Sequence, residues 1–325
     1  MTPSPFVGRY AALLSLREQL ASAHGGSRRV SFITGDTGIG KTTLCERFIR
    51  DIGADGRTWI GRGRCVKRET GVELFSTLVD ALADMSSTTH EPLRALEQLA
   101  PSWLERLPGF RSRDVSDAAF RLGPGRERCM ARELNAMLDV VAVQRTTILV
   151  VEDLQWADRA TIELLSTIGR RAYAARILIV GTIRWDDVPV SGYELAMARV
   201  ELRLRNRAVD VALAPFREGD VVEYLAARFA NQKLTARLAP ALHQLTAGNP
   251  RRLVTALERL QASSLLEHDH KGWHLHPSDR LLKDVMGVES AVPARRQVWR
   301  RHGMREPAVV GLSRQARAKP RAQPA

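Results

Sequence analysis

The sequence predicts an α/β fold, with a central parallel sheet flanked by helices and a smaller helical region at the C-terminal side. Three observations predict it. Short apolar runs alternate with stretches of helical periodicity between residues 30 and 214. A glycine-rich loop connects the first apolar run to a helix. From Pro215 onward the pattern is helical only, over residues 218–230, 234–247 and 251–263.

The composition is that of a folded globular protein. Of 325 residues, 44% are hydrophobic and 26% are charged, which suffices for one large core or two moderate ones. No segment approaches the roughly 20 apolar residues of a membrane helix, and the N-terminus lacks a signal core, so we expect a cytoplasmic protein with no membrane partner. The three cysteines are far apart and are expected to be free thiols.

The net charge of +13 is concentrated in the last 35 residues. Residues 291–325 contain nine Lys and Arg against one acid, Glu306, so they supply nine minus one, or +8. They show no apolar periodicity, and we predict a basic disordered tail. Such a tail can contact DNA phosphates without sequence specificity.

The first elements in chain order are a helix and a strand. A proline-bearing lead precedes a helix with Leu13, Leu16 and Leu20 at helical spacing, which we expect to dock on the core. The run 30–34 is typical of a short buried strand.

The loop after that strand fits G-x-x-x-x-G-K-[ST] at residues 35–42, the pattern of a P-loop. Glycines let its backbone N–H groups point at phosphate oxygens, beside the positive end of the next helix. We expect Lys41 to reach the β and γ phosphates and the Thr42 hydroxyl to bind Mg²⁺. The alternative is a glycine-rich turn with a surface lysine. The expected nucleotide contacts here are Gly35, Asp36, Thr37, Gly38, Ile39, Gly40, Lys41, Thr42 and Thr43.

The next stretch predicts a helix over 43–51 and a strand over 57–66. Gly61 and Gly63 in that strand indicate close packing or a bulge. A helix over 72–85 follows, then a Gly- and Pro-rich insertion at 86–125 that we expect to lie over the nucleotide domain.

A helix over 126–143 leads to TILVVEDLQWAD, residues 147–158, which is typical of a central parallel strand buried on both faces. Glu152 and Asp153 end this strand, where carboxylates lie beside P-loop phosphates and can bind Mg²⁺ and polarise a water molecule. The alternative is a pair of edge acids that serve solubility. We interpret Trp156 as a core aromatic and Asp158 as the N-cap of a helix over 159–174.

Another strand over 176–185 ends at Thr182 and Arg184. An arginine there can neutralise charge that develops during phosphoryl transfer, or it can be a solvated residue. A basic helix over 193–205 and a last strand over 210–214 complete the predicted sheet.

Three stretches together resemble the AAA and STAND regulatory ATPases: the Phe-Val-Gly-Arg turn at 6–9, EDLQWAD at 152–158, and the Gly-Asn-Pro turn at 248–250. EDLQWAD resembles the origin-recognition-like branch found in LuxR/MalT-type and cyclase-linked regulators, and the Gly-Asn-Pro turn resembles the Gly-x-Pro turn of STAND lids. The resemblance spans about residues 5–275. It implies that Val7, Gly8, Arg9 and Pro250 lie beside the adenine, and that Arg184 senses the γ-phosphate.

Three positions depart from the family pattern. Tyr10 stands where the family has Glu, Glu152 where it often has Asp, and Arg251 where it has a bulky apolar residue. Which acid binds metal and which acts on water is therefore open. Residues 6–9 can also be a helix-entry turn, and 248–250 a plain helix stop and start.

We predict four regions: an ATPase core at 1–214, a helical lid at 215–264, part of a winged-helix-like region at 265–290, and the tail at 291–325. The histidines at 268–276 are too loosely placed to predict a zinc site. By resemblance, such a chain is truncated before an effector domain.

The function expected first is a regulatory ATPase in signalling or transcription, which couples Mg-ATP binding and slow hydrolysis to a conformational switch. Two alternatives remain: a nucleotide switch without hydrolysis, and a DNA-associated initiator- or loader-like ATPase. The expected cofactors are ATP and Mg²⁺. The expected partners are ATP or ADP, a protein effector or a second copy, and DNA bound nonspecifically through the tail.

Overall fold

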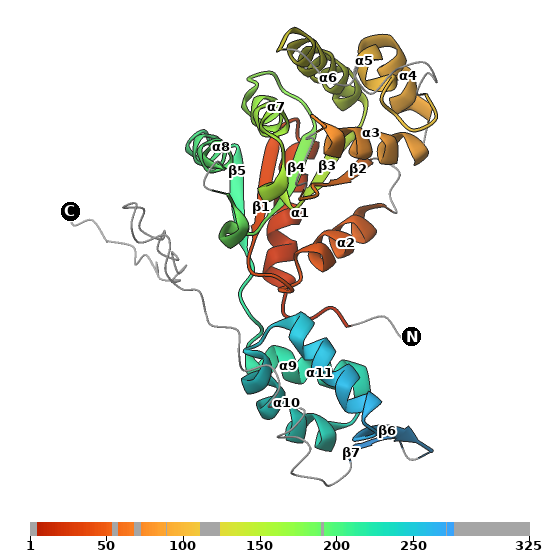
Figure 1. Cartoon of the computed structure of the whole chain (residues 1–325), viewed down its shortest axis with the longest axis vertical. Helices are drawn as coiled ribbons and strands as arrows, with labels where there is room; N and C mark the ends of the chain where they lie inside the picture. The colour runs from red at the N-terminus through yellow and green to blue at the C-terminus, as the bar shows by residue number, and fades with distance from the viewer. Residues whose placement is uncertain are drawn as a thin grey trace, which may run out of the picture. The chain divides into compact units, whose positions relative to one another are not determined.

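The computed structural model describes residues 5–53, 58–67, 73–88, 90–110, 124–189, 192–270 and 272–275. Five strands form one parallel sheet in the order β2-β3-β4-β1-β5. The predicted α/β fold with a central parallel sheet is therefore confirmed (Figure 1). The strands are β1 Arg29–Thr34, β2 Thr58–Arg64, β3 Thr146–Glu152, β4 Ile177–Ile183 and β5 Ala208–Ala212.

Helices cover both faces of the sheet and make two separate hydrophobic cores. One core lies under α1 and α2 and the other under α3 to α8, on opposite sides of the strands (Figure 1). Every residue of β3 and β4 is buried because these strands have helices on both sides. The helices are α1 Tyr10–His24, α2 Lys41–Ile52, α3 Ser76–Thr88, α6 Pro124–Gln144, α7 Arg159–Arg170 and α8 Tyr193–Leu204.

The two glycines of β2 allow α3 to pack directly on the sheet. A Cβ atom on Gly61 would lie 2.3 Å from the carbonyl oxygen of Ala81, and one on Gly63 would lie 2.0 Å from that of Thr77. Close packing, one of the two explanations that the sequence suggested, therefore accounts for both Gly61 and Gly63. The packing fixes the end of β2, which carries Arg62 and Arg64.

Part of the predicted insertion is helical and belongs to the core. It forms α4 His90–Leu99 and α5 Pro101–Leu104, and the fully buried Trp103 donates its indole N–H to the carbonyl oxygen of Met130 on α6 over 2.8 Å. Residues 111–123 of the insertion lie outside the described residues.

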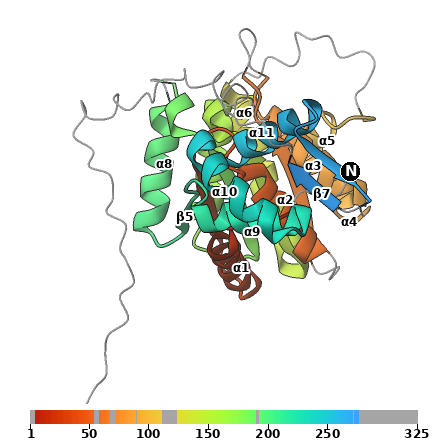
Figure 2. The same ribbon diagram turned by 90° about the horizontal axis from the view of Figure 1, so that it is seen from below.

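Three helices and a hairpin follow the sheet: α9 Glu218–Phe229, α10 Gln232–Thr246, α11 Pro250–Ala262, β6 Leu266–Asp269 and β7 Gly272–Leu275 (Figure 2). In the hairpin, residues 266–269 pair antiparallel with residues 272–275. The tail at 291–325 and most of 265–290 lie outside the described residues, so those two domain assignments stay predictions.

Two further predicted bounds shift. The helix predicted over 159–174 ends at Arg170, since Arg171 has an extended ψ of 136°. The last strand lies at Ala208–Ala212, two residues before the predicted 210–214.

As predicted, Asp158 is an N-cap, and its side chain accepts the Thr161 N–H. Trp156 is only half-buried against the core, with the Lys67 ammonium 5.2 Å from its ring centre.

Candidate functional site

The glycine-rich loop, residues 35–42, leaves β1 at the carboxyl edge of the sheet and leads into α2; we call it the cradle. Gly35, Gly38 and Gly40 all have positive φ, at 146°, 76° and 101°, a region that side chains rarely adopt. A Cβ on Gly40 would meet no atom within 4 Å, so the loop leaves open space at the start of α2. A backbone curled in this way fits a phosphate group.

Lys41 lies inside this curl. Its side chain is buried and donates to the carbonyl oxygens of Gly35 at 2.6 Å and Asp36 at 2.8 Å. Burial, with the Arg184 guanidinium nearby, lowers the pKa of the ammonium, while surrounding carboxylates oppose the shift. The lysine therefore stands at the place where the sequence predicted phosphate contacts.

Ile39 and Thr43, two other residues predicted to contact the nucleotide, differ in whether their side chains are accessible. Ile39 is 1% exposed and packs in the core under α1 and α2, so only its backbone faces the loop. Thr43 is exposed on the first turn of α2.

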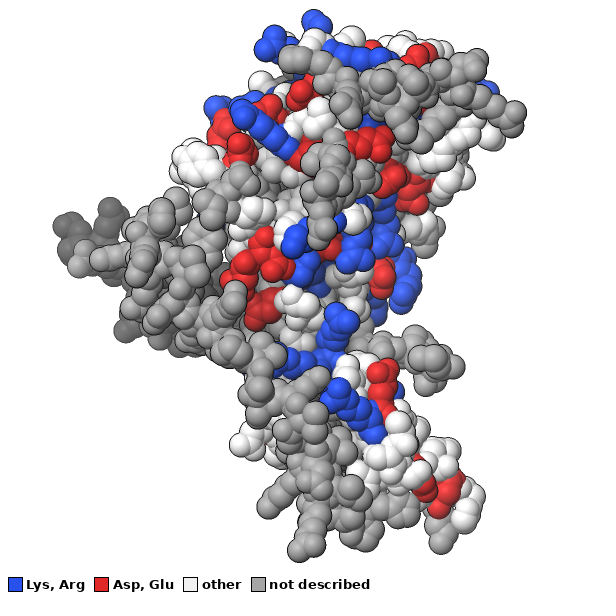
Figure 3. All heavy atoms as spheres, in the orientation of Figure 1, with Lys and Arg blue, Asp and Glu red and all other residues white. Residues whose placement is uncertain are grey.

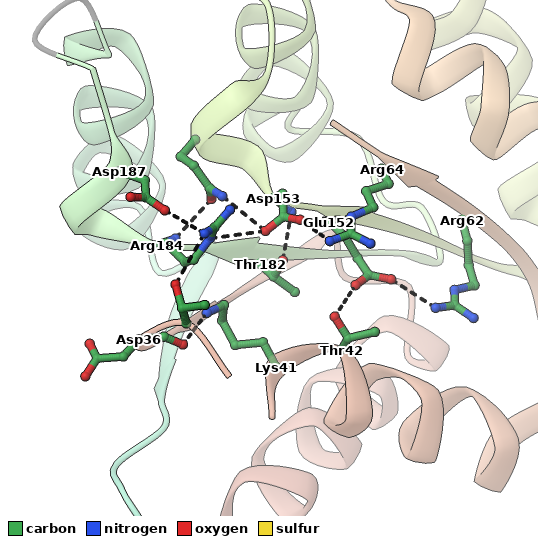
Figure 4. Close-up of polar contacts among 12 residues, drawn as sticks. Asp36, Lys41, Thr42, Arg62, Arg64, Glu152, Asp153, Thr182, Arg184 and Asp187 are labelled. Atoms are coloured by element: carbon green, nitrogen blue, oxygen red, sulfur yellow. Dashed lines mark hydrogen bonds and ion pairs between the residues drawn. The ribbon is translucent and has the colours of Figure 1, made fainter. Parts of the chain in front are cut away.

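Thr42 and Glu152 are brought together from α2 and β3. The Thr42 hydroxyl donates to Glu152 Oε2 over 2.6 Å, and Arg62 on β2 donates to Glu152 Oε1 over 2.9 Å (Figure 4). The Glu152 side chain is 8% exposed. A hydroxyl and a carboxylate at this spacing are oxygen ligands of the kind Mg²⁺ takes, and Mg²⁺ usually completes its shell with water and substrate phosphate.

Within the described ranges, no three His, Cys, Asp or Glu side chains are grouped so as to hold a metal ion. A site built by Thr42 and Glu152 would thus depend on a bound phosphate.

Asp153 has a different environment. Its φ of 58° turns the chain away from the strand, and its N–H donates to the buried Thr182 hydroxyl over 2.8 Å. Its carboxylate accepts bonds from Arg64 at 2.9 Å and Gln155 at 3.1 Å. Thr182 therefore orients Asp153 through the backbone, and the two acids point to different neighbours (Figure 4).

Arg184 follows β4 and connects both sides of the site. Its guanidinium lies 3.5 Å from Asp153 Oδ1 and 2.7 Å from Asp187 Oδ2, and it donates to the Thr37 hydroxyl over 3.3 Å. The structure thus brings Arg184 to the cradle, as expected for a side chain that meets phosphate.

The lid meets the cradle at the turn before α11. Asn249 donates to the Thr37 carbonyl oxygen over 2.9 Å, and the Arg251 N–H donates to that of Gly38 over 3.1 Å. Any Cβ on Gly38 would lie 2.6 Å from the Arg251 Cβ. Pro250 is the first residue of α11, as predicted for a helix start, and stands beside these contacts.

The N-terminal box also touches cradle and lid. Arg9 is buried, donates to the Ile39 carbonyl oxygen over 2.9 Å, and lies 4.7 Å from the centre of the Phe216 ring. Burial lowers its pKa, with Asp220 opposing. A Cβ on Gly8 would lie 2.8 Å from Asp220, and Val7 is buried. Residues 7–9 therefore do more than start α1, because Arg9 contacts the cradle and the lid as well.

Sequence reasoning missed Arg62, Arg64, Gln155 and the role of Asn249. A signal for the first two was available. In the predicted strand 57–66, Arg62 and Arg64 alternate with Gly61 and Gly63, so both arginines face away from the packed glycine side.

This face of the molecule carries charges of both signs. Figure 3 shows both blue and red side chains on this side of the molecule, with blue side chains gathered near the middle of the view. At the site, Arg62, Arg64 and Arg184 each lie against a carboxylate.

The parallel sheet, the cradle and the acids after β3 define a P-loop NTPase. The sequence matches the AAA ATPase domain over residues 5–180, more than half of the chain, and the protein belongs to that family. An ATPase of the AAA/STAND type is what the sequence predicted. No curated protein matches the sequence.

Several solved structures are similar at low sequence identity. RuvB from Thermotoga maritima is 13% identical, with 81% of this chain and 66% of that chain covered and a TM-score of 0.42. The Aeropyrum pernix ORC1 protein, solved with DNA, is 16% identical over 80% and 62%, at 0.43. A STAND protein with a tetratricopeptide repeat sensor from Pyrococcus horikoshii is 15% identical over 76% and 29%, at 0.39. Among the described residues, no helix has the length and apolar character needed to cross a membrane.

Proposed function

We propose that the protein is a regulatory ATPase that binds Mg-ATP in the cradle and uses the nucleotide to change how the lid is held. The observation that carries this proposal is the direct bonding of the lid turn to the cradle, through Asn249 and Arg251 to Thr37 and Gly38. A phosphate in the cradle contacts the loop whose carbonyl oxygens hold the lid. Nucleotide state and lid position are therefore coupled.

The proposed roles follow from the contacts. Residues 35–43 bind the phosphates, and Lys41 and Arg184 neutralise their charge. Val7, Gly8, Arg9 and Pro250 contact the adenine; Arg9 supports this by contacting both the cradle and the lid, at Ile39 and Phe216. Thr42 and Glu152 would hold Mg²⁺, which supplies positive charge to the phosphates when bound. Asp153 orients the attacking water and accepts its proton.

A second candidate is a nucleotide switch without hydrolysis. It is favoured by the state of Asp153, whose two carboxylate oxygens are engaged by Arg64, Gln155 and Arg184. These contacts occupy both carboxylate oxygens, so a water molecule has to compete with Arg64, Gln155 and Arg184 for Asp153.

Equilibrium binding and turnover separate the two candidates. We expect the purified chain to bind ATP and ADP with Mg²⁺ in calorimetry, and Lys41→Ala to abolish binding. Phosphate release under saturating Mg-ATP that disappears in Asp153→Asn, with ATP binding retained, supports the ATPase. Binding with no phosphate release supports the switch. Absence of nucleotide binding by the folded wild type overturns both.

The regulated process and its partners are proposed from the family resemblance. We propose a role in signalling or transcription, with a protein effector or a second copy as partner. DNA binding rests on the basic tail at 291–325, and deletion of the tail tests it. If a duplex binds in a salt-dependent way only when the tail is present, DNA is a partner. Equal or absent binding removes that role.

A further inference from the structure

We infer that Arg62 competes with a divalent cation for Glu152, so that the chain binds nucleotide without metal and gains little when Mg²⁺ is added. This inference rests on the proposed nucleotide function. It concerns a side chain on β2, outside the cradle and distinct from the two acids at the end of β3.

The geometry places Arg62 on the carboxylate that Thr42 also touches. Arg62 NH2 lies 2.9 Å from Glu152 Oε1, while the Thr42 hydroxyl lies 2.6 Å from Oε2 (Figure 4). A metal ion bound by Thr42 and Glu152 would therefore share its carboxylate with a fixed positive charge. Each cation lowers the affinity of Glu152 for the other.

The strand holds the backbone of Arg62 in place and leaves its guanidinium partly free. The Arg62 N–H donates to Asp84 Oδ2 over 2.9 Å, and the residue pairs in register with Val150 of β3. The Arg62 side chain is 36% exposed, whereas that of Glu152 is 8% exposed. The arginine can thus leave toward solvent when a metal binds, while the carboxylate stays at the site.

Arg62 also affects how tightly nucleotide binds in the absence of metal. A bare carboxylate at Glu152 would repel the phosphates that Lys41 binds, since both are negative and little water screens the buried acid. The Arg62 guanidinium cancels this charge. Removal of Arg62 should therefore have effects of opposite sign: weaker nucleotide binding in the absence of metal, and tighter binding of the metal.

The test uses ADP, which cannot be turned over, as the ligand of the full chain. A fluorescent ADP analogue is titrated in EDTA and then at increasing Mg²⁺ with wild type and Arg62→Gln. In EDTA we expect Arg62→Gln to bind ADP about three- to tenfold more weakly. The Mg²⁺ concentration for half-maximal enhancement should fall by about three- to tenfold, the scale of one partly exposed charge pair.

Two further variants connect the effect to Glu152. In a Glu152→Gln background, the Arg62→Gln substitution should leave the Mg²⁺ concentration for half-maximal enhancement unchanged, because the carboxylate for which the two cations compete is gone. Arg17→Gln is the matched control for the loss of one cation, since Arg17 pairs with Asp51 and its side chain is 51% exposed. Direct titration with Mn²⁺ followed by electron paramagnetic resonance gives the metal affinity independently of fluorescence.

The outcomes are distinguishable. Equal Mg²⁺ dependence of wild type and Arg62→Gln, with both proteins folded by circular dichroism, overturns the competition. If Arg62→Gln still lowers the Mg²⁺ requirement in the Glu152→Gln background, the assignment to Glu152 is overturned. A wild type that binds no ADP at saturating Mg²⁺ overturns the proposed function itself, and the competition with it.

Discussion

The side-chain amide of Asn249 donates to the carbonyl oxygen of Thr37 over 2.9 Å and connects residues 212 positions apart in the sequence. The same side chain accepts the N–H groups of Arg251 and Arg252, which makes Asn249 the N-cap of α11. One residue therefore begins a lid helix and holds the cradle. These two contacts use different ends of the amide, so they can be separated by substitution.

Asn249→Asp should release the cradle while keeping the cap. An aspartate accepts the N–H groups of α11 as asparagine does, but it has no donor for Thr37. We expect a stability close to wild type in urea unfolding, with faster amide hydrogen exchange in the cradle. Asn249→Ala should show the same fast exchange and lose about 0.5–2 kcal/mol in addition, the usual value of an N-cap. Slow exchange in both variants would contradict the coupling.

Gly63→Ala should be among the most destabilising single changes in β2. The new Cβ would lie 2.0 Å from the Thr77 carbonyl oxygen, so α3 must move off the sheet. We expect a loss of about 2–4 kcal/mol in the free energy of unfolding, the scale of severe overpacking. Gly53→Ala is the control, because Gly53 has φ of −65° and open space around its Cβ. Similar stabilities of the two variants would refute the packing argument.

The order of elements was predictable because the apolar runs are long and bounded by clear signals. The cradle, the strand that ends in Glu152 and Asp153, and the lid turn all carry local patterns, and the structure has each element within a few residues of the prediction. The register between strands and the partners of individual side chains could not be predicted in this way. The contact of Arg62 with Glu152 depends on which residue of β2 lies opposite which residue of β3, and a pattern within one strand does not contain that.

The neighbours of the two acids were also hidden from the sequence. They are adjacent in the chain, and an extended strand would point their side chains to opposite faces of the sheet. The left-handed conformation of Asp153, with φ of 58°, turns its carboxylate toward Arg64 and Arg184 and leaves Glu152 to Thr42. A single backbone dihedral thus decides the difference.

Arg28 should be essential for stability although it is far from the cradle. Its side chain is 1% exposed, and it donates to the carbonyl oxygens of Tyr173 at 3.0 Å and Ile168 at 3.3 Å and pairs with Asp139. Arg28→Ala removes the Arg28 donor from both carbonyl oxygens and leaves Asp139 with Arg171 alone, so we expect a loss of about 2–4 kcal/mol in urea unfolding. Arg29→Ala, which loses one bond from a half-buried side chain to the Asn206 carbonyl oxygen, should cost less than about 1 kcal/mol. Equal losses would contradict the assignment.

Cys45 should make the protein less stable in alkali. Burial raises the pKa of its thiol from 9.0 to about 12, with Glu152 adding to the shift and Arg62 opposing it. Below pH 9 the thiol is protonated in both folded and unfolded states, so its titration has no effect on stability. Between pH 9 and 12 the unfolded chain releases this proton and the folded chain keeps it, which favours unfolding.

The expected decrease in the free energy of unfolding from this one thiol is about 1 kcal/mol per pH unit in that window. Urea unfolding of wild type and Cys45→Ala at several pH values from 7.5 to about 10.5 measures it. The variant should be less stable at every pH because a buried side chain is lost, but its stability should fall less steeply above pH 9. Cys65, whose pKa burial also raises to about 12, stays in both proteins, so it cancels in the comparison. Parallel curves for the two proteins would mean that Cys45 ionises as readily in the folded state as in the unfolded one.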